Sequence, residues 1–302
     1  MAPPTHTLDL HFQDEPQTIA SYLIEHEGGG VLVETGPGST AAMLQARLAE
    51  HGLTPADITD VLVTHIHLDH AGAAGWCAQH GATVHVHHVG APHLRNPEKL
   101  WNSATRIYGD DMERLWGDIV PVPDDQLIEL NDGDEIDIGG LRFTALDTPG
   151  HAYHHMAFVL DGVCFTGDVG GVRIPGHEHV SLPLAPPEIR LDLWRDSIDT
   201  LREADIDRLM PTHFGPYDDV DAHLDRLEDG IRAAERWLPD ALADDPSDDA
   251  WRERVVHWMR QRAAKDGVSD DDWTLYETAN PSWMAAMGLR RYWTKYGAEA
   301  TE

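Results

Sequence analysis

The chain has 302 residues and a formal net charge of −31, with 53 acidic residues against 22 lysines and arginines. This length predicts one large domain with an appendage, or two small domains. A surface so rich in carboxylates argues against nucleic acid and anionic membranes as partners at ordinary salt. Molar salt would shrink the Debye length to about 3 Å and make the charge tolerable, so we predict a protein of a halophile.

Compartment and redox state follow from the cysteines and the amino terminus. Cys77 falls in a small-residue segment and Cys164 in an apolar strand, so we expect two unpaired core thiols. The first residues have no basic patch followed by an apolar run, and no segment approaches the length of a membrane span. The sequence therefore predicts a cytoplasmic protein with no membrane association.

The first elements in the chain are a hairpin and a helix. Apolar runs at residues 18–24 and 31–33 flank three glycines, which predicts two antiparallel strands. Glu34 begins a break rich in Gly and Pro. We then expect a helix over residues 40–50, capped by Ser39 and closed by Gly52.

Next comes the densest group of potential metal ligands. A strand over residues 60–64 leads directly into His65, His67, Asp69 and His70. Alternate residues of an extended segment point the same way, so these side chains can converge. A helix of small residues over 71–80 and a strand over 82–88 should follow. His85 and His87 share a face of that strand, but no carboxylate or cysteine beside them in sequence favours a second metal site.

Residues 92–123 predict a helical insertion that carries aromatic and polar side chains. Trp101, Tyr108 and Trp116 can bury the insertion against the body, or line a substrate pocket together with Arg106. Both alternatives stay open, because one ring can face the core while the next faces the cleft.

A series of short strands then predicts an antiparallel meander over residues 135–138, 141–146, 156–160 and 163–165. Its loops would present His151 and Asp168 at one sheet edge. The glycine-rich loop that follows carries Arg173 and His177, which are either substrate contacts or solvated loop residues.

The carboxyl-terminal part predicts a helix over 191–204, a strand over 206–210 that is followed by the candidate ligand His213, and a helix over 222–238. An acidic break over 240–249 is the best candidate boundary, which divides the chain into residues 1–238 and 239–302. Beyond it we expect helices over 251–264, 271–278 and 281–296, and their many aromatic residues must pack on something.

Together these residues define a metal centre. Imidazole and carboxylate ligands suit zinc, iron or manganese, and a cluster this dense can hold more than one ion. Two cations a few ångströms apart can share a water, lower its pKa and present the hydroxide to an electrophilic carbon or phosphorus. A centre of this kind can therefore activate water for attack on a bound substrate.

The sequence resembles the metallo-β-lactamase-fold superfamily, whose HxHxDH motif matches residues 65–70. It looks most like the glyoxalase II-like branch, in particular archaeal and bacterial hydrolases with TPGHAxHH and FTGD stretches. Members usually carry Asp where this chain has Glu34, a position that supports the metal site. The resemblance implies an α/β fold of the four-layer α+β type, an αββα sandwich with a carboxyl-terminal helical extension.

The resemblance also implies which residue does what. His65, His67 and His151 would hold one ion, Asp69, His70 and His213 the other, and Asp168 would bridge them. Asp69 and Asp168 would thereby take part in catalysis. Two divalent ions are expected, zinc first, with iron or manganese as alternatives.

The expected substrate is a small molecule, a thioester, lactone or other ester of a small organic acid. Aromatic rings with one or two arginines suit an apolar acid whose carboxylate is paired. The candidate contacts in this sequence are Trp101, Arg106, Tyr108, Trp116, Arg173 and His177. We leave open whether the protein is a homodimer.

Four alternative functions fit parts of the pattern. Persulfide dioxygenases keep the motif but use a single iron on the positions that match His65, His151 and Asp168, and they are the runner-up. Flavodiiron oxygen reductases usually carry Glu where this chain has His67. A nuclease is disfavoured by the acidity. An inert metal-binding scaffold or sensor would not need seven ligands and an aromatic insertion beside them.

Overall fold

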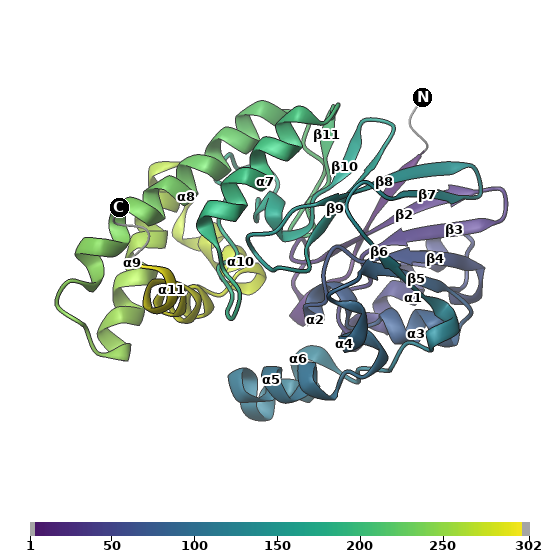
Figure 1. Cartoon of the computed structure of the whole chain (residues 1–302), viewed down its shortest axis with the longest axis horizontal. Helices are drawn as coiled ribbons and strands as arrows, with labels where there is room; N and C mark the ends of the chain where they lie inside the picture. Colours follow the sequence, from purple (N-terminus) through teal and green to yellow (C-terminus); the bar gives the residue numbers. More distant parts are fainter. Residues whose placement is uncertain (1–3, 298–302) are drawn as a thin grey trace.

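The computed structural model describes residues 4–297 and shows two β-sheets packed against each other, with helices on both outer sides (Figure 1). The first sheet has the order β1-β2-β3-β4-β5-β6. Its first three strands are antiparallel neighbours, and β3 to β6 are parallel. The strands are β1 (Thr5–Asp9), β2 (Ala20–His26), β3 (Gly29–Val33), β4 (Ile58–Leu62), β5 (Thr83–His87) and β6 (Leu127–Leu130).

The second sheet has the order β11-β10-β9-β8-β7 and is antiparallel except for the pair β10 and β11. It begins directly after β6, so the chain crosses from one sheet to the other at Asn131. The strands are β7 (Glu135–Ile138), β8 (Leu141–Asp147), β9 (Met156–Leu160), β10 (Val163–Phe165) and β11 (Arg208–Leu209).

The helices divide between the two outer faces. Those before β6 cover the first sheet, and those after β10 lie against the second sheet and extend away from it (Figure 1). The first set is α1 (Ala41–Glu50), α2 (Leu68–Ala71), α3 (Ala74–Gln79), α4 (Ala91–Arg95), α5 (Glu98–Tyr108) and α6 (Met112–Trp116). The second set is α7 (Leu191–Glu203), α8 (Val220–Leu242), α9 (Asp248–Lys265), α10 (Asp270–Ala279) and α11 (Ser282–Tyr296).

Three hydrophobic cores hold these layers together, and together they bury most of the large apolar side chains. One lies between the sheets, where Tyr22 and Val31 meet Phe143 and Phe158. A second joins the first sheet to the helices from α1 to α6. The third joins the second sheet to α7, α8 and the three carboxyl-terminal helices. The chain therefore has the expected αββα sandwich with a carboxyl-terminal helical part.

The hairpin and the meander are confirmed. Gly29 in the hairpin has φ +144, and a Cβ atom there would lie 2.2 Å from the backbone oxygen of Asp57, so the turn requires glycine. Two strands were not predicted. Both β1 and β6 are short edge strands whose apolar content does not alternate over enough residues to predict them.

Two local predictions were wrong. The helix expected over residues 71–80 is divided, because the backbone N–H of Ala73 donates to the oxygen of Gly36 at 2.9 Å instead of continuing α2. Ser39 does not cap α1. It lies in a 3-10 helix before α1, and its hydroxyl donates to the backbone oxygen of Leu115 at 2.6 Å, which attaches α6 to the body.

The carboxyl-terminal helices form as predicted, with one difference. Helix α8 continues through Pro239 to Leu242, into the segment that was expected to be a break. Residues of α7 to α11 share one hydrophobic core, in which Trp194, Trp251 and Leu289 are buried. The division of the chain at residue 238 stays a prediction.

Both cysteines are unpaired and buried, as expected. Burial raises the pKa of the Cys77 thiol to about 12. Among the described residues, no helix combines the length and apolar character needed to cross a bilayer.

Candidate metal centre

All seven predicted ligands lie at one edge of the sandwich, five of them in turns that follow strands and two on helix α2. His65 and His67 follow β4, His151 follows β8, Asp168 lies in a 3-10 helix after β10, and His213 follows β11. Asp69 and His70 lie on the first turn of α2, so helix geometry directs them and not the alternation of a strand. Parallel and antiparallel strands that end at one edge bring these distant segments together.

The ligand atoms form two groups, and within each group they lie within 4.8 Å of one another. The first group contains His65, His67, His151 and Asp168, and the second contains Asp69, His70 and His213. Asp168 faces both. Its Oδ2 lies 3.2 Å from Nε2 of His151, and its Oδ1 lies 3.2 Å from Nε2 of His70.

Hydrogen bonds on the far side of the rings fix the imidazoles. Nδ1 of His151 donates to the backbone oxygen of Pro183 at 2.7 Å, and Nδ1 of His213 donates to that of Thr18 at 2.7 Å. Because a carbonyl can only accept, Nδ1 of each ring carries the proton and Nε2 offers a lone pair to the centre. His67 is reversed, with Nδ1 toward the centre, 2.9 Å from Nε2 of His151.

Glu34 supports the site from behind, as the resemblance implied. Its carboxylate is buried and lies 3.0 Å from Nδ1 of His70. It also accepts from the hydroxyls of Thr64 and Thr212, the latter at 3.1 Å. A buried carboxylate with these partners orients the ring of His70 and makes it a better ligand.

The residues fit a bound cation. Nε2 of His65, Nε2 of His70 and Oδ1 of Asp168 are buried and have no hydrogen-bond partner, although buried polar atoms are normally paired. All three belong to the two ligand groups. A divalent ion would satisfy them.

The electrostatics favour the ligand forms of His65, His67 and His151 and of the two carboxylates. Burial lowers the pKa of His65 and His151, and that of His67 to about 3, so these rings are neutral. Burial alone would raise the pKa of Asp69, but the His70 charge and the His213 contact outweigh it and hold that pKa at about 2. For His70 and His213, burial lowers the pKa, but Asp168 and Asp69 together outweigh burial and raise it. These two rings therefore favour the protonated form, and a cation that binds there would displace a proton. The carboxylates therefore attract positive charge to this point.

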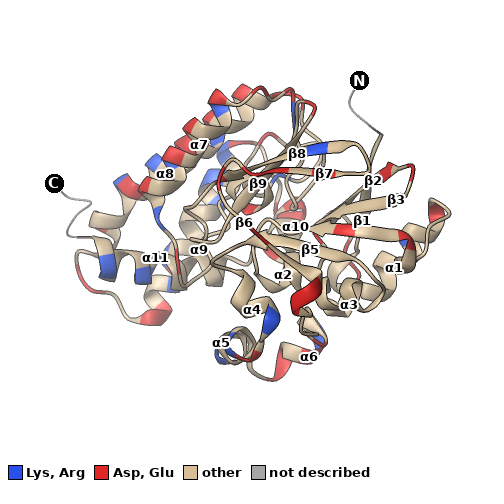
Figure 2. Cartoon of the chain, turned by 45° about the vertical axis from the view of Figure 1, so that its right-hand side comes forward, with Lys and Arg blue, Asp and Glu red and all other residues tan. Residues whose placement is uncertain are grey.

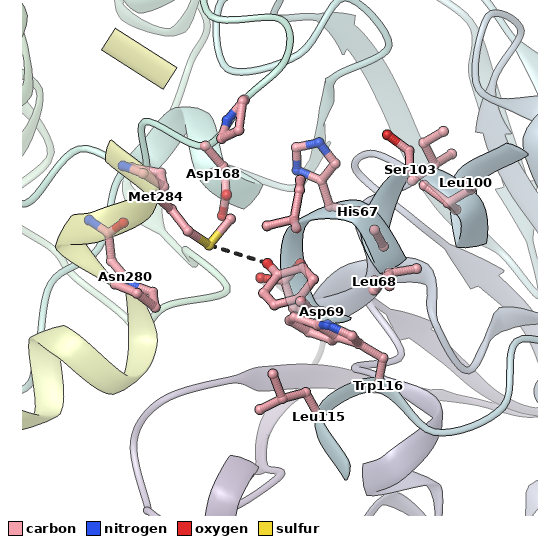
Figure 3. A pocket seen from close by; sticks show the side chains of 18 of the residues that line it. His67, Leu68, Asp69, Leu100, Ser103, Leu115, Trp116, Asp168, Asn280 and Met284 are labelled. Atoms are coloured by element: carbon pink, nitrogen blue, oxygen red, sulfur yellow. Dashed lines mark hydrogen bonds between the residues drawn. The ribbon is translucent and has the colours of Figure 1, made fainter. Parts of the chain in front are cut away.

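A cavity of about 980 Å³ opens onto the ligands, and its lining includes His67, Asp69, Asp168 and His213. Figure 3 shows His67, Asp69 and Asp168 pointing into it, between Met284 on one side and Ser103 on the other. The walls come from α5 and α6 of the insertion and from α10 and α11. Two of the carboxyl-terminal helices thus form part of the cavity wall.

The structure places three of the six predicted substrate contacts in this lining: Arg106, Tyr108 and Trp116. Trp101 does not line the cavity. Its side chain packs against the hydrophobic core that joins the first sheet to the helices from α1 to α6. Residues of the aromatic insertion therefore both pack against the body and line the cavity.

Arg173 and His177, the other two predicted contacts, do not line the cavity. Arg173 is buried, its Nε donates to the backbone oxygen of His177 at 2.8 Å, and its NH1 contacts Asp219 at 2.8 Å. Its guanidinium also stacks over Tyr217 at 4.2 Å. Nε2 of His177 lies 3.6 Å from Asp272. Both residues stabilise the loop after Asp168.

The pair His85 and His87 also has carboxylate partners that the sequence did not reveal. Nε2 of His85 lies 2.8 Å from Asp60, and Nε2 of His87 lies 3.2 Å from Asp147. Each ring has its own carboxylate, and they do not converge as a group of three ligands in the described residues.

Several lining residues were not predicted as site residues. His154, Lys99, Trp283 and Met284 all line the cavity. The TPGHAxHH stretch was the one signal for His154. For Trp283 and Met284, their place in an aromatic-rich helix indicated burial but not against which surface.

The comparisons with known proteins agree with this geometry. The sequence profile of the metallo-beta-lactamase superfamily matches residues 15–213, more than half of the chain. The chain belongs to this superfamily.

Particular relatives can be named. A metallo-beta-lactamase fold-containing protein of Sulfurisphaera tokodaii is 33% identical over 142 residues, 46% of this chain and 53% of that protein. Hydroxyacylglutathione hydrolase of Xanthomonas campestris pv. campestris is 30% identical over 146 residues, 48% of this chain and 44% of the enzyme. The chain spans about half the length of the curated relatives it matches. Among solved structures, a metallo-beta-lactamase family protein of Thermus thermophilus has a TM-score of 0.72 at 26% identity, covering 97% of this chain and 94% of that one.

Proposed function

We propose that the protein is a metal-dependent hydrolase that cleaves a thioester, lactone or other ester of a small organic acid. The observation that supports this most is the buried cluster of five imidazoles and two carboxylates with unpartnered ligand atoms, open to one cavity. The similarity to hydroxyacylglutathione hydrolase supports hydrolysis as the type of reaction.

The donor set suits two divalent ions, zinc first, with iron or manganese as alternatives. His65, His67 and His151 would hold one and Asp69, His70 and His213 the other, with one oxygen of Asp168 facing each group. Divalent ions bound there would acidify water and polarise the substrate carbonyl.

The chain's own residues supply orientation and enclosure. Pro183 and Thr18 hold the rings of His151 and His213 through their backbone oxygens. Burial keeps bulk water away from His65, His70 and Asp168, which strengthens the electrostatic interactions among them. Neither cysteine lines the cavity, so a cysteine nucleophile has no place in the proposal.

Metal analysis combined with a substrate panel tests the proposal. We expect close to two ions per chain, because seven ligands exceed the needs of one tetrahedral ion. Turnover should appear with thioesters or lactones and not with phosphodiesters, and His65→Ala should abolish it, whereas His257→Ala on α9 should not. One iron per chain with oxygen consumption on glutathione persulfide would replace this proposal by the dioxygenase alternative. Metal binding with no turnover on any substrate would support a scaffold.

The setting is part of the proposal: a cytoplasmic protein of a halophile, acting on a small molecule, with a homodimer left open. Its support is the surface charge, with Asp and Glu spread over α7, α8 and the loops in Figure 2. Lowering KCl from molar to hundredth-molar lengthens the Debye length from about 3 Å to about 30 Å, so the carboxylates repel one another more. The melting temperature should therefore rise with KCl, and a flat or falling profile would contradict the halophile prediction.

A further inference from the structure

The cavity has a cationic stripe along helix α5. Lys99, Ser103 and Arg106 are spaced i, i+4 and i+7, which places them on one face of the helix. All three line the cavity. Figure 3 shows Ser103 at the wall opposite Met284. Lys99 and Arg106 are exposed, so they lie at the rim.

These two cations are unpaired. Most arginines in residues 4–297 contact a carboxylate, as Arg95 and Arg202 do. In the same part of the chain, Lys99 and Arg106 take part in no ion pair or side-chain hydrogen bond. The whole chain has only three lysines, and one of them lies at this cavity. Free positive charge at the rim is unexpected where carboxylates outnumber cations so strongly.

The carboxylates nearest in the lining do not pair with the stripe. Asp111 contacts Arg114 at 3.1 Å. Glu188 accepts from the backbone N–H of Tyr153 at 3.3 Å, and Glu277 accepts from that of Ser282 at 3.2 Å. Among the described residues, none of these acids lies within 4 Å of the charged atoms of Lys99 or Arg106, so both cations can contact a ligand.

The inner wall beyond the stripe is apolar and large. Ile107, Trp116, Trp283 and Met284 contribute to it, and the volume of about 980 Å³ exceeds what a small acid fills. An apolar body of several carbons would remove this surface from water.

We propose that Lys99, Ser103 and Arg106 form an anion subsite, and that the substrate is an anionic amphiphile. Its apolar body lies in the cavity, and its carboxylate or phosphate binds the stripe. Arg and Lys are the side chains that pair with such groups. At long range the net charge of the protein repels anions, so local cations are needed at the entrance. This inference rests on the proposed hydrolysis at the metal centre, and it extends the substrate beyond a small acid.

Three thioesters test the subsite in the metal-loaded protein at one fixed KCl concentration. The neutral one is the octanoyl thioester of 2-mercaptoethanol. The second carries a carboxylate on the leaving thiol, as octanoyl 3-mercaptopropionate, and the third carries it on the acyl end, as the suberoyl thioester of 2-mercaptoethanol. The double variant Lys99→Gln/Arg106→Gln is compared with Arg142→Gln/Lys265→Gln, two exposed cations outside the lining, so both lose the same charge.

We expect the α5 variant to raise the KM of at least one anionic thioester about tenfold, with a change of less than about twofold for the neutral one. The thioester that responds shows which end of the substrate reaches the stripe. Equal changes for neutral and anionic substrates, or the same loss in the control variant, would overturn the subsite.

A binding measurement separates this inference from the proposed reaction. Trp116 and Trp283 line the cavity, so their fluorescence should report on ligands. Octanoate should bind more tightly than 1-octanol to the unmodified chain, and the α5 variant should remove most of that difference. If no thioester is hydrolysed, the proposed function fails, while this difference still decides the subsite. Equal affinity for octanoate and 1-octanol would overturn it.

Discussion

The ligand cluster and the walls of the cavity above it are built in opposite ways. In the cluster, His70, His151 and His213 are each held on the outer ring nitrogen by a buried partner. The walls come from two segments far apart in sequence. Where they meet, the Tyr108 hydroxyl donates to Sδ of Met284 at 3.2 Å, the dashed line in Figure 3, and its ring meets Trp283 edge-on at 5.9 Å.

This difference suggests that the ligand cluster carries out the reaction and that the walls of the cavity select the substrate. A thioether is a weak acceptor, so the contact between the walls is easily exchanged for a contact with a ligand. A network of charged and buried groups cannot rearrange without leaving a charge unpaired. Changes in the cluster should therefore cost far more than changes in the walls.

The largest effect should come from the ligands themselves. His151→Ala removes a ligand, and Asp168→Asn keeps an oxygen donor but removes the charge that faces both groups. We expect both to lower kcat/KM by roughly 100- to 1000-fold or more, with metal content falling further in His151→Ala. Kinetics and metal analysis on the same samples check this. Near-normal turnover of Asp168→Asn would contradict the assignment.

A buried histidine that holds the loop after Asp168, His223, should lower the stability of the fold at acid pH. His223 on α8 is buried and donates from Nε2 to the backbone oxygen of Gly170 at 2.7 Å. Burial lowers its pKa from the ordinary 6.5 to about 4. The unfolded chain therefore takes up a proton below pH 6.5 while the folded chain does not until about pH 4. The contribution of the neutral His223 ring to the free energy of unfolding is therefore complete above pH 6.5. As the pH falls from 6.5 to about 4, the free energy of unfolding decreases by about 3 kcal/mol.

Urea unfolding at pH 7 and pH 4.5 measures this loss. The variant His223→Gln has no titrating group, so it should lose less stability between the two pH values than the unmodified chain does. Other buried histidines contribute equally to both proteins. If both proteins lost the same free energy of unfolding between pH 7 and pH 4.5, His223 would not be a source of the acid sensitivity.

A smaller effect is expected one step behind the ligands. Glu34→Gln removes the charge that orients His70 but keeps the size of the side chain. Changes of this kind lower metal affinity or activity about 10- to 100-fold. Metal titration with a competing chelator checks this, with Glu27→Gln, an exposed residue of the hairpin, as the matched control. If Glu34→Gln binds metal as tightly as the control does, the contact between the Glu34 carboxylate and His70 is not needed for metal binding.

The smallest effect should come from the wall. Tyr108→Phe removes the hydroxyl that contacts Met284 and keeps the ring. The free energy of unfolding should change by less than about 1 kcal/mol, and kcat should stay the same. The KM for bulky substrates should change a few-fold, because the cavity opens more readily. A large loss of kcat would place Tyr108 in the chemistry instead.

Much of the site was visible in the sequence because its ligands sit on local features. Most of them follow an apolar strand in a short turn, as His65 and Asp168 do, and that pattern is set by neighbours in the chain. Asp69 and His70 lie on α2 directly after such a turn. The strands β1 and β6 escaped prediction because edge strands of four or five residues are stabilised by a partner and not by their own pattern.

The candidate ligands, the order of the main elements and the helical insertion could be predicted from the amino-acid sequence, since these depend on hydrophobic periodicity and turn residues. The surroundings of the candidate ligands could not be predicted and came from the three-dimensional structure. Arg173 lies five residues after Asp168, yet its side chain turns to Asp219, whereas Met284 reaches Tyr108 across 176 positions of the chain. Side-chain direction and the packing of distant helices depend on three-dimensional contacts, which local sequence does not specify.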